Sequence, residues 1–267
     1  MEGGFFIFGR VSVPDFHAVV FDLFDTLVDF DPGLIPKVMI NGKPERTTSI
    51  NAYEALVENG YPVPLYEDFH RHWIETSKEV WGERDRDPEH REVTSRARFM
   101  KFADRLDSLP PERREAAAAL AMETHMERLI NSTAFEAARL LMLGRIREAG
   151  LRVGLISNFD NTEAAHRLLG RTGIDAYLEA TLISGEVGYR KPARRLYIQV
   201  ADALGVSPGE VLFVGDNFEA DVLGPRSAGM PSAWLNPRGG PPPDGAAAPD
   251  YEIKNLLDVL KVLNLDA

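Results

Sequence analysis

Apolar, β-branched-rich runs alternate with helix-like segments along the second half of the chain. The apolar runs are LRVGLIS (151–157), ATLIS (180–184), EVLFVGD (210–216) and PSAWLN (231–236). The intervening segments end on glycine, which is a common helix stop. They cover residues 161–170, 193–205 and 218–229. Strands that alternate with helices predict βαβ units, and strands this apolar predict a mostly parallel sheet with both faces covered.

The run VVFDL (19–23) predicts one more strand, but residues 24–133 separate it from the helical segment 134–150 that leads into the next strand. This long separation contains helix-friendly runs such as residues 113–130 and few strand-like segments. We therefore predict a doubly wound, Rossmann-like α/β core at residues 1–31 and 132–267, and an inserted α-helical cap domain at residues 32–131. A helical insert beside a strand end is well placed to act as a lid.

The end of the chain predicts two small elements. Residues 251–253 are expected to add a short edge strand after a turn-rich loop. Residues 255–265 place leucines on one face of a closing amphipathic helix.

Composition excludes several classes of function. The chain has 267 residues, a formal net charge of −11 and no cysteine. The acidic balance disfavours nucleic-acid binding, and the lack of cysteine rules out disulfides, thiolate catalysis and Cys-based zinc sites. The apolar run at residues 5–8 is too short for a signal peptide, and no apolar stretch approaches the roughly 20 residues of a spanning helix. We expect a cytoplasmic protein with no membrane partner; its oligomeric state is not indicated.

Polar side chains follow the predicted strands at the point where each strand ends. They are Asp22, Ser157, Asn158, Ser184, Asp216 and Asn217, with Lys191 and Asp221 a few residues further on. Ligands of open α/β sheets bind beyond the carboxyl ends of the strands, so these side chains are expected to share one site.

The residue types at this edge indicate a metal and an anion. Asp22, Asp216 and Asp221 would place three negative charges close together, which requires a compensating cation. An all-oxygen ligand set suits Mg²⁺. Lys191 would neutralise a nucleophile or an incoming phosphate, and Ser157 with nearby backbone N–H groups would hold anionic oxygens. The sequence therefore predicts a Mg²⁺ site that binds a small anionic substrate.

Four segments together resemble the motifs of the haloacid dehalogenase-like hydrolase superfamily, in the family's order. They are Asp22-Leu23-Phe24-Asp25-Thr26, the strand LISN that ends in Ser157-Asn158, Gly188-Tyr189-Arg190-Lys191-Pro192, and the segment from Gly215-Asp216-Asn217 to Asp221. The resemblance extends over about residues 17–265, with the insert in the family's expected place.

The resemblance implies a mechanism. Asp22 would attack the substrate and form a covalent aspartyl intermediate that water then hydrolyses. In the phosphatases of the family, Mg²⁺ is held by groups that correspond here to Asp22, the backbone carbonyl of Phe24 and Asp216, with support from Asp221. The phosphoryl group would be held by Ser157, Asn158 and Lys191, with electrostatic support from Arg190.

The chain departs from the phosphatase pattern at Phe24. Phosphatases of the family carry there a second Asp that protonates the leaving oxygen, and losing a general acid costs on the order of 10²–10⁴ in rate. Asp25 falls one residue later, and a shift of one residue near a strand end turns the side chain away. We expect Asp25 to cap local N–H groups, although the sequence leaves open which group replaces the missing acid.

Three functions remain compatible with these residues. A Mg²⁺-dependent phosphatase that acts on a small phosphorylated metabolite is favoured by the three carboxylates. A 2-haloacid dehalogenase is favoured by Phe24, because a halide leaves without a proton. However, the loop after the first motif has no clear arginine to hold a halocarboxylate, and Arg46 and several arginines of the cap are candidates without a predicted place. A degenerate family member that binds a ligand or partner without turnover is the third.

Two groups in the cap region are interpreted as structural. His70, His72 and Trp73 are expected to combine core packing with a solvated face. The segment with Arg96, Arg98 and Phe99 is expected to lie on a solvated face; the alternative is that it faces the active site and holds a substrate anion. The cap sequence does not indicate the substrate.

Overall fold

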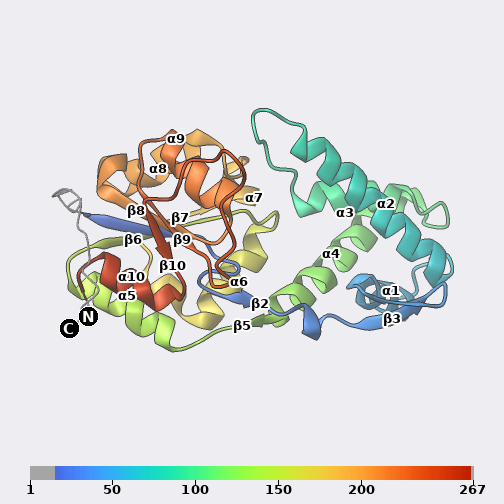
Figure 1. The fold of residues 1–267 in the computed structure, drawn as a ribbon. Helices are drawn as coiled ribbons and strands as arrows, with labels where there is room; N and C mark the ends of the chain where they lie inside the picture. Colours follow the sequence, from blue (N-terminus) through green and yellow to red (C-terminus); the bar gives the residue numbers. More distant parts are fainter. Residues whose placement is uncertain (1–15, 266–267) are drawn as a thin grey trace.

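The computed structural model describes residues 16–265; the apolar run at residues 5–8 lies outside the described residues. Its centre is a six-stranded sheet in which the paired strands are parallel. The strand order is β10 (Tyr251–Ile253), β9 (Ser232–Leu235), β8 (Val211–Gly215), β1 (Ala18–Phe21), β6 (Arg152–Ser157) and β7 (Ala180–Ile183). This arrangement confirms the predicted doubly wound α/β core (Figure 1).

Helices cover both faces of the sheet, which explains why its strands are apolar throughout. Successive side chains of β1 point to opposite faces, so Val19 and Phe21 join one buried cluster while Ala18 and Val20 join another. The first cluster is closed by α5 (Ala138–Glu148), α6 (Thr162–Thr172) and α10 (Val259–Val262). The second is closed mainly by α8 (Arg194–Leu204).

Strand β1 lies where the strand order changes direction, between β6 and β8. In the register of the sheet, Phe21 is level with Leu155 of β6 and Val214 of β8. The residues that follow these three positions therefore emerge at the same carboxyl edge, which is where an open α/β sheet binds its ligands.

Three predicted helices differ in extent. The helix expected from residue 134 begins at Ala138, because β5 (Thr133–Ala134) pairs antiparallel with β2 (Asp29–Phe30). The segment 218–229 forms a π-helical turn (Glu219–Leu223) and then α9 (Gly224–Ser227), since Pro225 has no N–H to continue the helical bonds. The closing helix is reduced to a 3₁₀ turn (Leu256–Asp258) and α10.

The insert contains four helices and its own apolar cluster. The helices are α1 (Ser49–Glu58), α2 (Tyr66–Asp85), α3 (Ser95–Asp104) and α4 (Arg114–Asn131). They pack around buried aromatic residues that include Phe69, Trp73 and Phe102. Figure 1 shows this group beside the sheet, joined to it near β2 and β5. The division of the chain into two domains at residues 32 and 131 stays a prediction.

The insert also holds a hairpin that the sequence analysis did not predict. Strands β3 (Lys37–Ile40) and β4 (Lys43–Arg46) pair antiparallel around Asn41 and Gly42. Both turn residues have positive φ, at 49° and 75°. An Asn-Gly pair is the usual sequence signal for a two-residue hairpin turn, so the signal was present.

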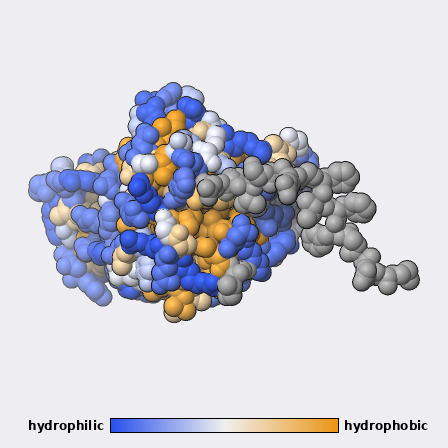
Figure 2. Space-filling model, turned by 90° about the vertical axis from the view of Figure 1, so that its left-hand side faces the viewer, coloured by the Kyte–Doolittle hydropathy of each residue, from blue (hydrophilic) through white to orange (hydrophobic). Residues whose placement is uncertain are grey.

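The surface of the described residues is mixed. No helix among them is long and apolar enough to cross a membrane. Figure 2 views the end of the core opposite the insert, where hydrophilic side chains predominate around a central apolar area.

Candidate active site

Three carboxylates meet at the carboxyl edge of the sheet. Asp22 follows β1, Asp216 follows β8, and Asp221 lies in the π-helical turn behind them. One carboxylate oxygen from each lies within 4.8 Å of the others. Asp22 and Asp221 are buried. The structure thus brings together the three acids that the strand-end pattern placed at one site.

Lys191 reaches into this cluster from the loop after β7. Its Nζ donates to Asp22 Oδ1 at 2.6 Å and to Asp221 Oδ1 at 2.7 Å. Burial lowers the pKa of Lys191, but the charges of the two carboxylates outweigh it, so the net direction is upward. Lys191 therefore stays cationic, yet it is one cation beside three acids.

The remaining charge imbalance is visible in the pKa values of the other two acids. Burial raises the pKa of Asp216 to about 7, and the charges of Asp22 and Asp221 add to this effect. Burial also raises the pKa of Asp221 to about 6, against the opposing charge of Lys191. The charge of Lys191 therefore does not fully compensate the burial and mutual repulsion of Asp216 and Asp221. An added cation would relieve this repulsion, and the all-oxygen donors suit Mg²⁺.

The metal-free protein is expected to become less stable as the pH rises from about 4 to about 7. The pKa of Asp216 is raised from 3.8 to about 7, so the folded state binds more protons than the unfolded state in this window. The free energy of unfolding therefore falls with rising pH. Thermal unfolding in chelator is measured for wild type and for an Asp216→Asn variant across this pH range. The difference between the two proteins should show the slope, because the contributions of the other titrating groups cancel in that difference.

Added Mg²⁺ is expected to raise the melting temperature more at pH 7.5 than at pH 5, because protons compete for the same carboxylates. An equal rise in melting temperature at both pH values would contradict a Mg²⁺ site at these carboxylates. The same dependence of stability on pH in Asp216→Asn as in wild type would contradict the raised pKa of Asp216.

Ser157 and Asn158 end strand β6 and have different partners. Ser157 is buried, and its Oγ has no hydrogen-bond partner among the described residues. A buried hydroxyl without a partner is costly, so it fits a site where a ligand oxygen completes the bond. Asn158 accepts from Lys191 N at 2.7 Å and donates to Lys191 O at 3.0 Å. Its side chain therefore holds the backbone that carries the lysine.

The loop after β1 carries the departure from the phosphatase pattern. The ring of Phe24 lies against Phe159, with centroids 5.0 Å apart. Asp25 has a positive φ of 57° and accepts from Phe30 N at 3.0 Å. The predicted capping role of Asp25 is confirmed. No proton donor is supplied by the side chain at position 24.

Two other polar residues, Ser184 from the strand-end pattern and Arg190 from the family resemblance, contact the insert and lie outside the acidic cluster. Arg190 Nη2 donates to Arg84 O and to Asp85 Oδ1, both at 3.1 Å. Ser184, which directly follows β7, donates from Oγ to Glu92 Oε2 at 2.6 Å. Arg190 Nη2 therefore binds the insert, whereas the buried Nε of Arg190 has no hydrogen-bond partner among the described residues. The role of Arg190 in substrate binding stays a prediction.

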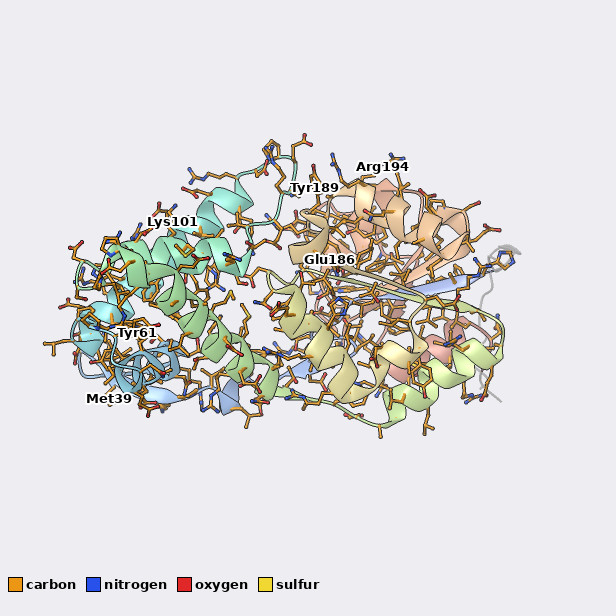
Figure 3. The ribbon with its side chains drawn as sticks, turned by 180° about the vertical axis from the view of Figure 1, so that it is seen from behind. Met39, Tyr61, Lys101, Glu186, Tyr189 and Arg194 are labelled. Atoms are coloured by element: carbon orange, nitrogen blue, oxygen red, sulfur yellow. The ribbon has the colours of Figure 1, made fainter. Side chains whose placement is uncertain are left out.

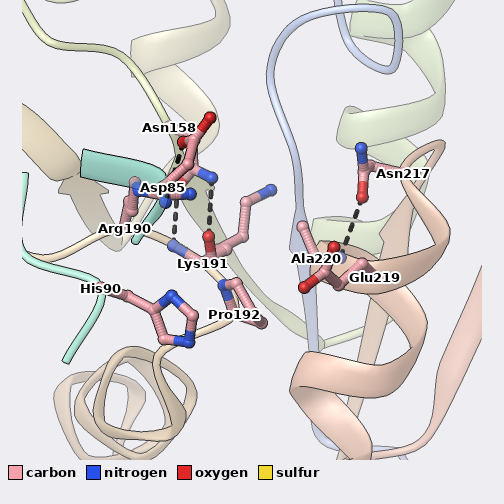
Figure 4. Close-up of a pocket in the computed structure, with 9 residues that line it drawn as sticks. All are labelled: Asp85, His90, Asn158, Arg190, Lys191, Pro192, Asn217, Glu219 and Ala220. Carbon is pink, nitrogen blue, oxygen red and sulfur yellow. Dashed lines mark hydrogen bonds and ion pairs between the residues drawn. The ribbon is translucent and has the colours of Figure 1, made fainter. Parts of the chain in front are cut away.

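A pocket of about 370 Å³ lies at the junction of core and insert. It is lined by Asp85, His90, Asn158, Arg190, Lys191, Pro192, Asn217, Glu219 and Ala220. Figure 4 shows Asn217 and Glu219 across the pocket from Arg190 and His90. The sequence analysis did not identify Asp85, His90 or Glu219 as site residues. No local pattern distinguishes the first two from other polar residues of the insert.

The expected solvated face around Arg98 is wrong. Arg98 is 5% exposed and pairs with Asp160, which follows β6, at 3.1 Å. Phe99 is also buried, in the aromatic cluster beside Trp73. The segment lies against the core, which local sequence does not reveal. Arg96 alone matches the expectation, because it is exposed and pairs with Glu115 at 2.6 Å.

The other residues of the insert that the sequence singled out have structural partners. His70 and Trp73 are buried while His72 is partly exposed, which matches the expected mix of packing and solvated face. Arg46 Nη1 donates to Gly33 O at 2.8 Å and Ile35 O at 2.6 Å. The guanidinium of Arg46 therefore stabilises the nearby loop that contains Gly33 and Ile35.

The sequence is similar to those of known hydrolases. A sequence model of the haloacid dehalogenase-like hydrolases matches residues 16–229. The chain is 38% identical to a phosphoserine phosphatase of Thermus thermophilus over 117 residues, which is 44% of this chain and only 46% of that protein. It is 28% identical to a glyceraldehyde 3-phosphate phosphatase of Methanopyrus kandleri over 248 residues, which is 90% of this chain and 98% of that protein.

Solved structures share the fold over nearly the whole chain. A 2-haloacid dehalogenase from Pseudomonas syringae has a TM-score of 0.67 at 25% identity, with 93% of this chain and 98% of that chain covered. A phosphatase from Thermococcus onnurineus has a TM-score of 0.62 at 24% identity, with 92% and 97% covered. With the acidic cluster, the lysine and the parallel sheet in place, the family match over residues 16–229 shows that this chain belongs to the haloacid dehalogenase-like hydrolase family.

Proposed function

We propose that this hydrolase is a Mg²⁺-dependent phosphatase that acts on a small phosphorylated metabolite through an aspartyl-phosphate intermediate. The observation that carries the proposal is the cluster of Asp22, Asp216 and Asp221 within 4.8 Å, beside a single buried lysine. Three acids so close are stable as carboxylates only when further positive charge is supplied. A metal-free reaction has no use for this arrangement.

The ligands proposed for Mg²⁺ are Asp22, Asp216, Asp221 and the backbone carbonyl of Phe24. All are oxygen donors, which this ion prefers. When bound, Mg²⁺ would supply positive charge to the carboxylates and to the oxygens of the phosphate.

The chain's own residues account for the two chemical steps. Asp22 attacks phosphorus, and the bond to the leaving oxygen breaks with its electron pair going to that oxygen. Lys191 and the unpartnered hydroxyl of Ser157 hold the phosphoryl oxygens. Water then attacks phosphorus, the bond to Asp22 breaks to restore the carboxylate, and the protons of the water leave with the released phosphate. Phe24 has no proton to give, so substrates whose leaving group is stable as an anion are expected to react fastest.

The size of the site and the names of the relatives support a small substrate. A pocket of about 370 Å³ beside Lys191 has room for a metabolite of a few carbon atoms and its phosphate. The two relatives named above act on phosphoserine and on glyceraldehyde 3-phosphate, according to their names.

A 2-haloacid dehalogenase is the second candidate, and Phe24 is the observation that favours it. The similar structure from Pseudomonas syringae carries that name. Two observations count against it. A dehalogenase has no need of three gathered carboxylates, and Arg46, the arginine nearest in sequence after the first motif, is bound to Gly33 O and Ile35 O.

A panel of three substrates separates these candidates. With p-nitrophenyl phosphate or acetyl phosphate, phosphate release is expected with Mg²⁺ and is expected to fall to background in chelator. With 2-chloropropionate, no chloride release is expected. Chloride release that is insensitive to chelator would establish the dehalogenase instead, and no turnover on any of the three would favour a family member that binds without catalysis.

A further inference from the structure

The loop that carries Lys191 runs beside a segment of the insert. Arg190 N donates to His90 O at 2.9 Å, and Glu92 N donates to Gly188 O at 3.0 Å. These bonds flank an antiparallel bridge between Arg91 and Tyr189. Figure 3 shows Tyr189 where the core meets the insert. The insert thus makes hydrogen bonds to the loop at Gly188 and Arg190, three residues and one residue before Lys191.

Glu92 adds a side-chain contact to this junction. Its carboxylate is 1% exposed, and Oε2 accepts from Ser184 Oγ at 2.6 Å. Its other oxygen accepts from Val93 N at 2.9 Å, and Arg84 Nη1 lies 3.9 Å away. A buried carboxylate is retained only where such partners compensate the loss of water, so its location is well determined.

The partners of Glu92 lie at the two ends of one short element. Ser184 begins helix α7 (Ser184–Val187), and Gly188 directly follows it. The side chain of Glu92 binds the first of these residues and its backbone binds the second. The core also binds this loop, because the side chain of Asn158 forms hydrogen bonds with the backbone N–H and the backbone carbonyl of Lys191.

We propose that Glu92 is a positioning residue for catalysis, which fixes α7 and the loop after it so that Lys191 Nζ meets Asp22. This inference rests on the proposed function, since it gives Lys191 a role in phosphoryl transfer. A consequence is that the insert does more than cover the site. Its docked position sets the position of a core residue that contacts the nucleophile.

The test is a Glu92→Ala variant assayed with p-nitrophenyl phosphate and Mg²⁺. A displaced catalytic group of this kind costs on the order of 10- to 100-fold, and the loss is expected in kcat. Glu92→Gln keeps an oxygen that accepts from Ser184 and is expected to stay within a few-fold of wild type. A double-mutant cycle with Lys191→Ala shows whether the two residues act together: the effect of Glu92→Ala should disappear when the lysine is absent.

Asp160→Asn is the matched control. It removes the charge of a different buried contact between insert and core, the ion pair with Arg98 at 3.1 Å, and changes neither the bond from Ser184 to Glu92 nor those between Asn158 and Lys191. Any loss of rate in this variant is expected to be the same with and without Lys191. If Glu92→Ala behaves in that additive way, or keeps the wild-type kcat, Glu92 is not a positioning residue.

Hydrogen exchange provides a readout that does not depend on activity. The amide of Arg190 is bonded to His90 O in wild type, so exchange over residues 185–191 is expected to be slow. It should become faster in Glu92→Ala but not in Glu92→Gln or Asp160→Asn. Unchanged exchange in Glu92→Ala would overturn the inference. Failure of the phosphatase proposal would appear separately, as a lack of Mg²⁺-dependent turnover in wild type.

Discussion

An Asp22→Asn variant is expected to lose Mg²⁺-dependent phosphatase activity by roughly 10⁴–10⁶-fold, as for the loss of other enzymatic nucleophiles. The amide cannot form the acyl phosphate, and it also removes one of the two carboxylates that bind Lys191. Initial rates with p-nitrophenyl phosphate in Mg²⁺ measure the effect.

The fold of the Asp22→Asn variant is expected to remain intact. The charge of Asp22 raises the pKa values of both Asp216 and Asp221, so its removal reduces repulsion in the metal-free cluster. Circular dichroism and thermal unfolding serve as the control. A folded variant that keeps more than roughly a hundredth of the wild-type rate would show that another residue is the nucleophile.

A Phe24→Asp variant is expected to gain phosphomonoester turnover, by up to about 10²–10⁴ for leaving groups that need a proton. The new carboxyl would stand two residues after Asp22, where phosphatases of the family carry their acid. The gain should be larger for an alkyl phosphate than for p-nitrophenyl phosphate, whose leaving group departs as an anion. The comparison of kcat for these two substrates in wild type and variant measures this difference.

Phe24→Asn is the control for Phe24→Asp, because both changes remove the ring contact with Phe159 and only one adds an acid. Both variants are expected to lose some stability through that contact. Equal turnover in the two variants, while Asp22→Asn still abolishes the basal rate, would mean that Phe24 does not mark the position of a missing acid.

The sheet and its acidic cluster could be predicted because their signals are local. A buried strand needs an apolar run, and a carboxylate directly after such a run must emerge at the sheet edge. Asp22 and Asp216 satisfy this rule, and Asp221 follows within one turn. Lys191 was expected at the same edge because it follows a predicted strand by a few residues, but its two partners, Asp22 and Asp221, are seen only in the structure.

The contacts between insert and core could not be predicted, since each joins residues far apart in the sequence. Ser184 and Glu92 are separated by 92 positions, and nothing near either residue identifies the other. Arg98 presents the same difficulty. A charged residue on a helix usually faces water, but Arg98 is buried with Asp160 across the junction as its ion-pair partner. The hairpin at Asn41-Gly42 is different, because its turn signal is local and lies in the sequence itself.

The short pair of β2 and β5 has a consequence for how such a protein evolves. Asp29 pairs with Ala134, and Asp31 N donates to Ser132 O at 2.8 Å, so the chain leaves and re-enters the core at one point. A segment whose two ends already touch is exchangeable: a longer, shorter or differently folded piece fits the same junction without reordering the sheet. Such a replacement would leave the strand order as it is, but it would also have to supply the acceptor that Glu92 gives to Ser184.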